Sequence, residues 1–195
     1  MADLIAASDL KTHLQIAAAT ATWDTVLAAL ATAASKAIEI YCDREFTDTA
    51  ARVEYYDGNG YDVLTPRHHP IISVTSLYDD PSRDFGASTL IDATYYYIDT
   101  TNGSRRIVLA PGPYTRVFAI ARGNIKLTYR SGYASNVFPA DLVLAAKSLG
   151  AFYFNRRKSE GRTNESMGNL SMSHAQEWPE DVRLILGRYR NQEYS

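Results

Sequence analysis

Apolar and polar residues change their spacing twice along the chain, which divides it into three blocks. Residues from about 8 to 44, and from about 139 to the end, repeat apolar positions every three or four residues, which is the helical period. Residues from about 50 to 133 carry β-branched and aromatic runs between turn sequences, which is typical of short strands. The pattern therefore predicts helices at both ends of the chain and strands between them.

The first block predicts two helices. Ser8 is a suitable N-cap, and Leu10 and Leu14 share one face of a short first helix. A second helix should begin near Thr22, and its alanines would allow another helix to approach closely. The apolar stripe expected to be buried on it consists of Val26, Leu30, Ala33/Ala34, Ala37/Ile38 and Tyr41.

The last block predicts two more helices with a polar segment between them. One should have Pro139 in its first turn, and the other should begin at Pro179. The apolar face of the first is Leu142, Ala146, Leu149 and Phe152/Tyr153, and that of the second is Val182, Ile185, Leu186 and Tyr189. Residues 159–177 are polar and without period, so a mobile loop is expected there.

The middle block predicts a small antiparallel sheet or barrel. Turn sequences such as Asp57-Gly58-Asn59-Gly60 and Asn102-Gly103 separate runs that alternate or are rich in tyrosine and isoleucine. The predicted fold class is α+β, with a helical bundle formed by the N- and C-terminal segments and an inserted small antiparallel β domain. The expected domains are residues 1–48 with 136–195 for the helices, and residues 49–135 for the insertion, because an insertion enters and leaves a host domain at nearby points.

Composition limits the classes of function. The formal charge is −2, whereas a protein that holds DNA by neutralising phosphates carries a basic excess. Cys42 is the only cysteine, so an internal disulfide is excluded and a reducing compartment fits. No signal peptide is expected from the first residues, and the Ala17–Ala37 stretch looks too polar and too short to cross a membrane.

The candidate chemical groups favour structural roles. Asp79-Asp80 precedes a proline, where aspartates are common in solvated turns. His68 and His69 are adjacent in an extended segment and should point to opposite faces, so they are poorly placed to chelate one metal ion. A nucleophile–base pair of Cys42 and His13, as in a small hydrolase, has no local activating group. No catalytic, metal or cofactor-binding residue is expected.

One basic run stands out at the end of the third predicted helix. It consists of Arg156, Arg157, Lys158 and the nearby Arg162. A solvated helix end explains it, because cations are favourable at a helix C-terminus. Contact with an acidic partner or with DNA, for example in a channel, is the alternative, and a DNA-binding module remains a competing hypothesis.

Several short motifs, in this order, resemble head–tail connector proteins of tailed bacteriophages, also called adaptor or head-completion proteins. The resemblance covers nearly the whole chain except residues 159–177. The motifs are Leu10-Lys11-Thr12-His13-Leu14, Trp23-Asp24-Thr25-Val26-Leu27, Arg44-Glu45-Phe46, Tyr55-Tyr56-Asp57-Gly58, Pro70-Ile71-Ile72-Ser73-Val74, Tyr129-Arg130-Ser131-Gly132-Tyr133, Pro139-Ala140-Asp141-Leu142 and Trp178-Pro179-Glu180-Asp181-Val182.

The resemblance implies a structural subunit of the virion, at the head–tail junction, assembled in the bacterial host cytoplasm, and not an enzyme. Such proteins form a ring, usually of twelve subunits, under the portal. The ring extends the DNA channel and completes the head. It also offers a docking surface to the next neck or tail protein, which is a stopper or a tail terminator. DNA would pass without specific binding, and neither a cofactor nor a membrane is involved. A neck or tail-completion protein that binds a tail component in place of the portal is the alternative.

The resemblance also implies that the C-terminal segment docks on the portal. Residues 179–195 are the expected docking segment, with a tail that is free before docking. The residues expected to anchor it are Val182, Ile185, Leu186 and Tyr189, with Arg188 and Arg190 meeting acidic groups of the portal.

Overall fold

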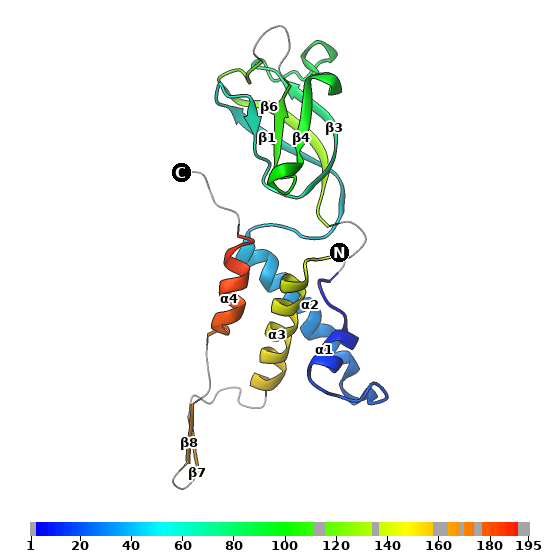
Figure 1. The fold of residues 1–195 in the computed structure, drawn as a ribbon, viewed down its shortest axis with the longest axis vertical. Coiled ribbons are helices and arrows are strands. Elements are labelled where there is room, and N and C mark those ends of the chain that lie inside the picture. The colour runs from blue at the N-terminus through cyan, green and yellow to red at the C-terminus, as the bar shows by residue number, and fades with distance from the viewer. Residues whose placement is uncertain are drawn as a thin grey trace. The chain divides into compact units, whose positions relative to one another are not determined.

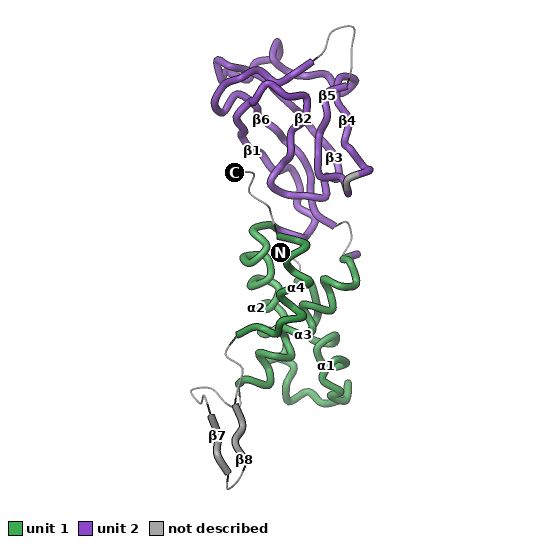
Figure 2. The backbone as a smooth tube through the Cα atoms, turned by 60° about the vertical axis from the view of Figure 1, so that its left-hand side comes forward, with its two compact units in different colours: residues 1–44, 138–195 green, residues 45–137 purple. Residues whose placement is uncertain are grey.

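The computed structural model describes residues 3–110, 116–133, 137–157, 164–167, 170–173 and 177–190. The chain forms two compact units, one of residues 1–44 with 138–195 and one of residues 45–137, coloured separately in Figure 2. The first unit holds the helices and the second holds two small antiparallel sheets. The expected α+β class, with helices at both ends and an inserted antiparallel β domain, is confirmed.

The helical unit is built from both ends of the chain (Figure 1). Its α-helices are α1 (Ala7–His13), α2 (Asp24–Cys42), α3 (Ala140–Arg156) and α4 (Glu180–Gly187), and a 3-10 turn, η1 (Ala21–Trp23), leads into α2. The first helix begins earlier than expected. Ala6 is the N-cap, and its N–H donates to the Asp9 carboxylate at 2.9 Å, so Ser8 lies inside the helix.

The buried stripe of α2 differs from the expected one. Leu27, Ala31 and Cys42 are buried with Ala34 and Ile38, whereas Val26, Leu30 and Ala37 are only half-buried and Ala33 is exposed. The spacing allowed either stripe, because apolar residues occupy two neighbouring faces of this helix. Residues 21–42 are also long and apolar enough to cross a membrane by length and composition, with a mean hydropathy of 1.3, which corrects the expectation from residues 17–37. A buried core helix passes the same test, and one face of α2 is such a core.

The third helix crosses α1 closely. Leu142, Ala146 and Leu149 are buried as expected, but Phe154 is the buried aromatic residue near its end, while Phe152 and Tyr153 are half-buried. A Cβ atom at Gly150 would lie 2.7 Å from a methyl group of Leu10. The absence of a side chain at residue 150 therefore sets how near α1 and α3 can pack.

The β unit contains two three-stranded antiparallel sheets. The strands are β1 (Thr49–Gly58), β2 (Val63–Leu64), β3 (Ile71–Asp79), β4 (Tyr96–Asp99), β5 (Arg106–Leu109) and β6 (Ala121–Ser131), in the orders β1-β6-β3 and β2-β5-β4. Short 3-10 turns lie at Ala87–Thr89, Ala93–Tyr95 and Thr100–Asn102. One apolar core joins the sheets: Leu64, Ile71, Leu77, Ile107, Leu109, Phe118, Ile125, Leu127 and Tyr129.

Two expectations about loops need correction. Residues 159–177 were expected to form a loop, but their described residues include two paired strands, β7 (Asn164–Met167) and β8 (Leu170–Ser173). Residues 159–163, 168–169 and 174–176 lie outside the described residues. The aspartate pair leads into a turn as expected, with the Arg83 N–H donating to the Asp80 carbonyl oxygen at 3.0 Å, but the Asp80 side chain is not solvated. Asp80 is 4% exposed and accepts N–H groups of Ser82, Asp84 and Phe85, and Asp79 accepts from Ala119 N and Asn124 Nδ2. These carboxylates replace missing backbone partners in a loop.

We predict that Gly132→Ala strongly destabilises the β unit. Gly132 has a φ of +113°, which side chains rarely adopt, and a Cβ atom there would overlap the carbonyl group of Thr47. The expected loss in the free energy of unfolding is about 3 kcal/mol or more, from overpacking and backbone strain together. Gly86→Ala is the matched control, because a Cβ atom at Gly86 meets nothing within 4 Å. Calorimetric unfolding would contradict this prediction if both variants melted like the parent.

Candidate functional site

Two of the four residues expected to anchor the C-terminal segment on a partner lie in the core of the helical unit, and the other two are half-buried. Val182 and Leu186 have no exposed surface, and Ile185 is half-buried. Tyr189 is also half-buried, and its hydroxyl donates to Asp141 Oδ1 of α3 at 2.6 Å. In this fold the apolar face of α4 holds the helix against its own chain, so Val182 and Leu186 offer no surface to a portal.

Other groups of the same segment remain accessible. Leu184 is 68% exposed, and Arg188 and Arg190 are exposed. The Arg190 guanidinium lies 5.9 Å from the ring centre of Tyr41, which itself packs against Trp178 with ring centres 5.5 Å apart. The sequence pattern did not single out Leu184, because that residue lies off the apolar line of α4. Residues 191–195 lie outside the described residues.

The basic run at the end of α3 separates into different environments. Arg156 is exposed, whereas Arg157 lies over two aromatic rings, with its guanidinium carbon 4.2 Å from the Trp23 ring centre and 4.1 Å from that of Phe154. The two rings meet edge to face at 5.8 Å. Arg157 is therefore a packing residue, since the ring faces attract its charge. Lys158 and Arg162 lie outside the described residues.

We predict that Arg157→Ala lowers the free energy of unfolding of the helical unit by about 1 kcal/mol, the scale of a cation–π contact that is partly desolvated. Arg156→Ala is the control, because Arg156 is exposed on the same helix end. Both tryptophans, Trp23 and Trp178, belong to the helical unit. Urea unfolding followed by tryptophan fluorescence therefore reports on this unit, and equal losses in the two variants would contradict the prediction.

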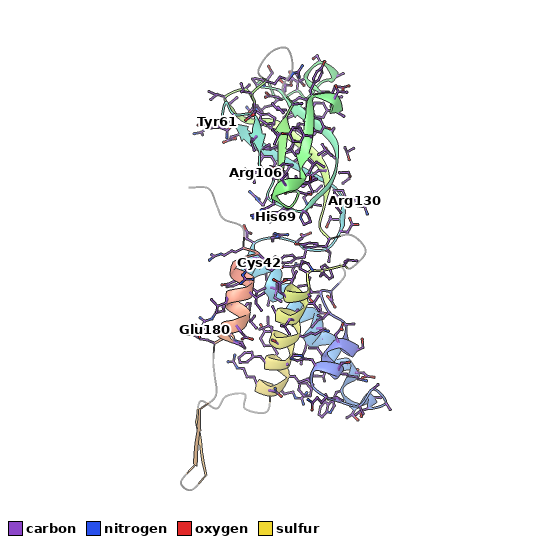
Figure 3. All side chains as sticks on the ribbon, in the orientation of Figure 1. Cys42, Tyr61, His69, Arg106, Arg130 and Glu180 are labelled. Carbon is purple, nitrogen blue, oxygen red and sulfur yellow. The ribbon has the colours of Figure 1, made fainter. Side chains whose placement is uncertain are left out.

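Cys42 has the environment of a structural thiol. It lies at the end of α2, as labelled in Figure 3, has no exposed surface, and donates to the carbonyl oxygen of Leu186 at 3.8 Å. Burial raises the pKa of the Cys42 thiol to about 11, which disfavours the reactive thiolate. His13, its hypothetical base, is exposed at the end of α1.

A partly buried polar network in the β unit brings several titratable groups together. The carboxylate of Glu54 accepts hydrogen bonds from the hydroxyls of Tyr56 and Tyr129, the latter at 2.7 Å. Its other oxygen lies 3.5 Å from Nε2 of His68. From its place in the sequence, His68 could be considered only as a poorly placed metal ligand. Glu54 and Tyr129 are distant from it in sequence and meet it only in the folded unit, so residue spacing does not predict this network.

Further hydrogen bonds fix the imidazole of His68. Its Nδ1 accepts from the backbone N–H of Glu45 at 3.3 Å, and its own backbone N–H donates to Tyr129 Oη at 3.2 Å. Arg52 pairs with Glu45 at 2.8 Å. Among the described residues no group of three or more His, Cys, Asp or Glu side chains could hold a metal ion. The network joins the entry segment of the β unit to β1, β6 and the segment before β3.

The electrostatics of this network keep its two phenols and its imidazole neutral. Burial and the Glu54 carboxylate raise the pKa of Tyr56, and burial with neighbouring Tyr56 and Glu54 raises that of Tyr129. Burial, followed by the positive charge of Arg52 and opposed by Glu54 and Glu45, lowers the pKa of His68. Phenols that stay protonated and an imidazole that stays neutral make a fixed hydrogen-bond network, which rigidifies the unit.

We predict that the β unit loses stability below neutral pH, in part because of His68. The fold lowers the pKa of His68 from 6.5. As the pH falls through that unfolded value, the unfolded chain takes up a proton that the folded chain does not, so unfolding is favoured. The measurement is the opening free energy of β6 amides by hydrogen exchange, corrected for intrinsic exchange.

The matched variant is His68→Asn, whose amide oxygen can accept the Glu45 N–H without titrating. Its stability should change less between about pH 7.5 and pH 5.5 than that of the parent, because the titrating imidazole is gone. Equal pH dependence in the two proteins would remove His68 as the cause.

Comparisons with known proteins agree with this architecture. A chain from the virion of a native gene transfer agent (GTA) particle has 20% identity and a TM-score of 0.59, covering 98% of this chain and 92% of that one. A chain from the neck of an empty GTA particle, computed with C6 symmetry, has 21% identity and a TM-score of 0.59 with the same coverage. A chain from the neck of a native GTA particle, computed with C12 symmetry, has 20% identity and a TM-score of 0.55, covering 100% and 96%. At identities of 20–21%, the similarity to these chains shows that they share the fold of this chain.

No curated protein matches the chain. A family model does, and it bears the description head completion protein; it matches residues 3–192, which include the helices at both ends and the whole inserted β unit. The family expected from the order of the sequence motifs is therefore confirmed: the chain belongs to the head completion protein family.

Proposed function

We propose that this chain is a structural subunit of the neck of a tailed, phage-like particle. It forms a ring under the portal, extends the DNA channel, completes the head and provides the docking surface for the tail. The observation that carries the proposal is the family match over residues 3–192 together with a shared fold. The similar chains come from a GTA virion and from GTA necks computed with C6 and C12 symmetry, which supports a ring of twelve at the head–tail junction.

The role is mechanical, so packing and hydrogen bonding perform it without a reacting group. Supporting this, Cys42 is buried with a raised thiol pKa, and the Glu54 network holds protonated phenols and a neutral imidazole. A net charge of −2 suits DNA that passes without being bound, because no basic excess retains its phosphates. The chain is therefore proposed to be no enzyme.

The portal contact is proposed to use the exposed groups of the C-terminal segment. These groups are Leu184, Arg188 and Arg190. Two arginines within three residues suit acidic groups of a partner, because each guanidinium can hold a carboxylate with two hydrogen bonds. Val182 and Leu186 support the contact indirectly by seating α4 on the helical unit.

We predict that the double variant Arg188→Glu/Arg190→Glu loses portal binding while the subunit still folds. Charge reversal turns attraction to acidic portal groups into repulsion, and both side chains are exposed. Deletion of residues 179–195 is a poorer test, because it would remove Val182 and Leu186 from the core. The control is Arg83→Glu/Arg122→Glu, which reverses two exposed arginines of the β unit.

The readout is co-sedimentation of the full-length chain with purified portal rings, followed by counting particles with attached tails. Retained portal binding by the Arg188→Glu/Arg190→Glu variant would overturn the contact assignment. Binding to a purified tail component and not to the portal would support a neck or tail-completion role in its place.

A further inference from the structure

Helix α2 carries a second apolar face that the described residues of the chain leave partly exposed. Ile40 is 71% exposed, Ala29 and Ala33 are exposed, and Val26, Leu30 and Ala37 are half-buried. These six residues, called here the outer face of α2, recur every three or four positions over almost the full helix, as one continuous stripe does. The outer face includes Leu30 and Ile40, so it is a broad apolar surface and more than a row of alanines.

The rest of the helical unit packs on the other side of α2. Leu27, Ala31, Ala34, Ile38 and Cys42 form the buried stripe, and α1, α3 and α4 all contact this helix. With 100° between successive residues, Ala29, Ala33 and Ile40 lie opposite that stripe. A helix that is apolar on two faces is normally covered on both, so the outer face indicates a missing neighbour.

Helix α3 also presents an exposed leucine. Leu142, Ala145, Ala146 and Leu149 form its buried stripe, whereas Leu144 is 50% exposed and Ala140 is exposed. By the same helical geometry, Leu144 points away from that stripe. α2 and α3 pack against each other, and Ile40 and Leu144 each point away from the buried stripe of their own helix, so they belong to two different outward faces of the helical unit. α2 ends and α3 begins at the same end of the helical unit (Figure 1), and by residue number Ile40 belongs to the last turn of α2 and Leu144 to the first turns of α3.

We propose that the outer face of α2 is covered by a second copy of this chain, which contributes the Leu144 side of α3. The inference rests on the proposed ring. A closed ring joins copies head to tail, so each subunit needs two different patches, and Ile40 and Leu144 supply one on each of two outward faces. Copies related by rotation about one axis keep the same height, which agrees with both patches lying at one end of the helical unit.

The chemistry of the outer face favours a protein helix over other occupants. Its six residues carry no charge, as in the core of a protein interface, and its alanines allow a helix backbone to come near. The bordering Lys36 is ion-paired with Glu39 of its own chain at 3.0 Å. Nucleic acid would require cations, and a lipid bilayer would have to surround a helix whose opposite side already packs on three others.

The test is cross-linking in particles assembled with the full-length chain. The double variant Ile40→Cys/Leu144→Cys is treated with a short bismaleimide and run on a denaturing gel. Cys42 should not react, since it is fully buried and its thiol pKa is raised to about 11. The expected product is a ladder of multimers, because each copy links to the next. Each single variant should stay monomeric, and so should Ile120→Cys/Leu144→Cys, in which the 83% exposed Ile120 of the β unit replaces Ile40.

Three results would overturn the inference. Monomers from the double variant, when the chain is present in purified particles, show that copies do not meet there. Dimers from Ile40→Cys alone indicate a two-fold contact of the outer face with itself. Cross-links of Ile40→Cys to another particle protein assign the outer face to that protein. Absence of the parent chain from purified particles instead refutes the proposed function, so the two failures are distinguishable.

Discussion

Burial of the two chain ends against each other is the interaction on which this structure depends. Val182 and Leu186, near the C-terminus, are fully buried in a unit whose other core residues include Leu10, Leu27 and Ile38 from the N-terminal block. Burying one such side chain contributes about 1.5–3 kcal/mol. Because these residues are separated by more than the entire β unit in sequence, the helical unit cannot form until the β unit has been made and both ends are present.

The burial of α4 against its own chain changes the role expected for the C-terminal segment. A segment that folded only on docking would leave its apolar face uncovered in the free subunit, whereas α4 already covers that face with its own chain. The groups of this segment that point outward are Leu184, Arg188 and Arg190. In the proposed portal contact, stability would come from the inner face of α4 and assembly would use the outer one.

Helix α2 shows the same division within one element. Its inner stripe is packed within the helical unit, and its outer face is apolar and partly exposed among the described residues. In the β unit, by contrast, the partly buried carboxylate of Glu54 binds two phenols and approaches an imidazole beside the apolar core. Such satisfied polar networks favour one arrangement of the strands, which suits a rigid component of an assembly.

The local pattern determined the classes of element and their order. Helical period at both ends, strand-like runs between turns, and the apolar face of α4 all follow from spacing, since a side chain's direction depends on residue number within an element. The tertiary structure decided what each face meets. It placed Leu27 and Ala31 inward although Val26 and Leu30 have the same period, covered Val182 and Leu186, and set Arg157 over Trp23 and Phe154. It also brought His68 to Glu54 and Tyr129. Those outcomes depend on contacts between residues far apart in the chain. The periodicity of one element does not indicate which other element packs against each of its faces.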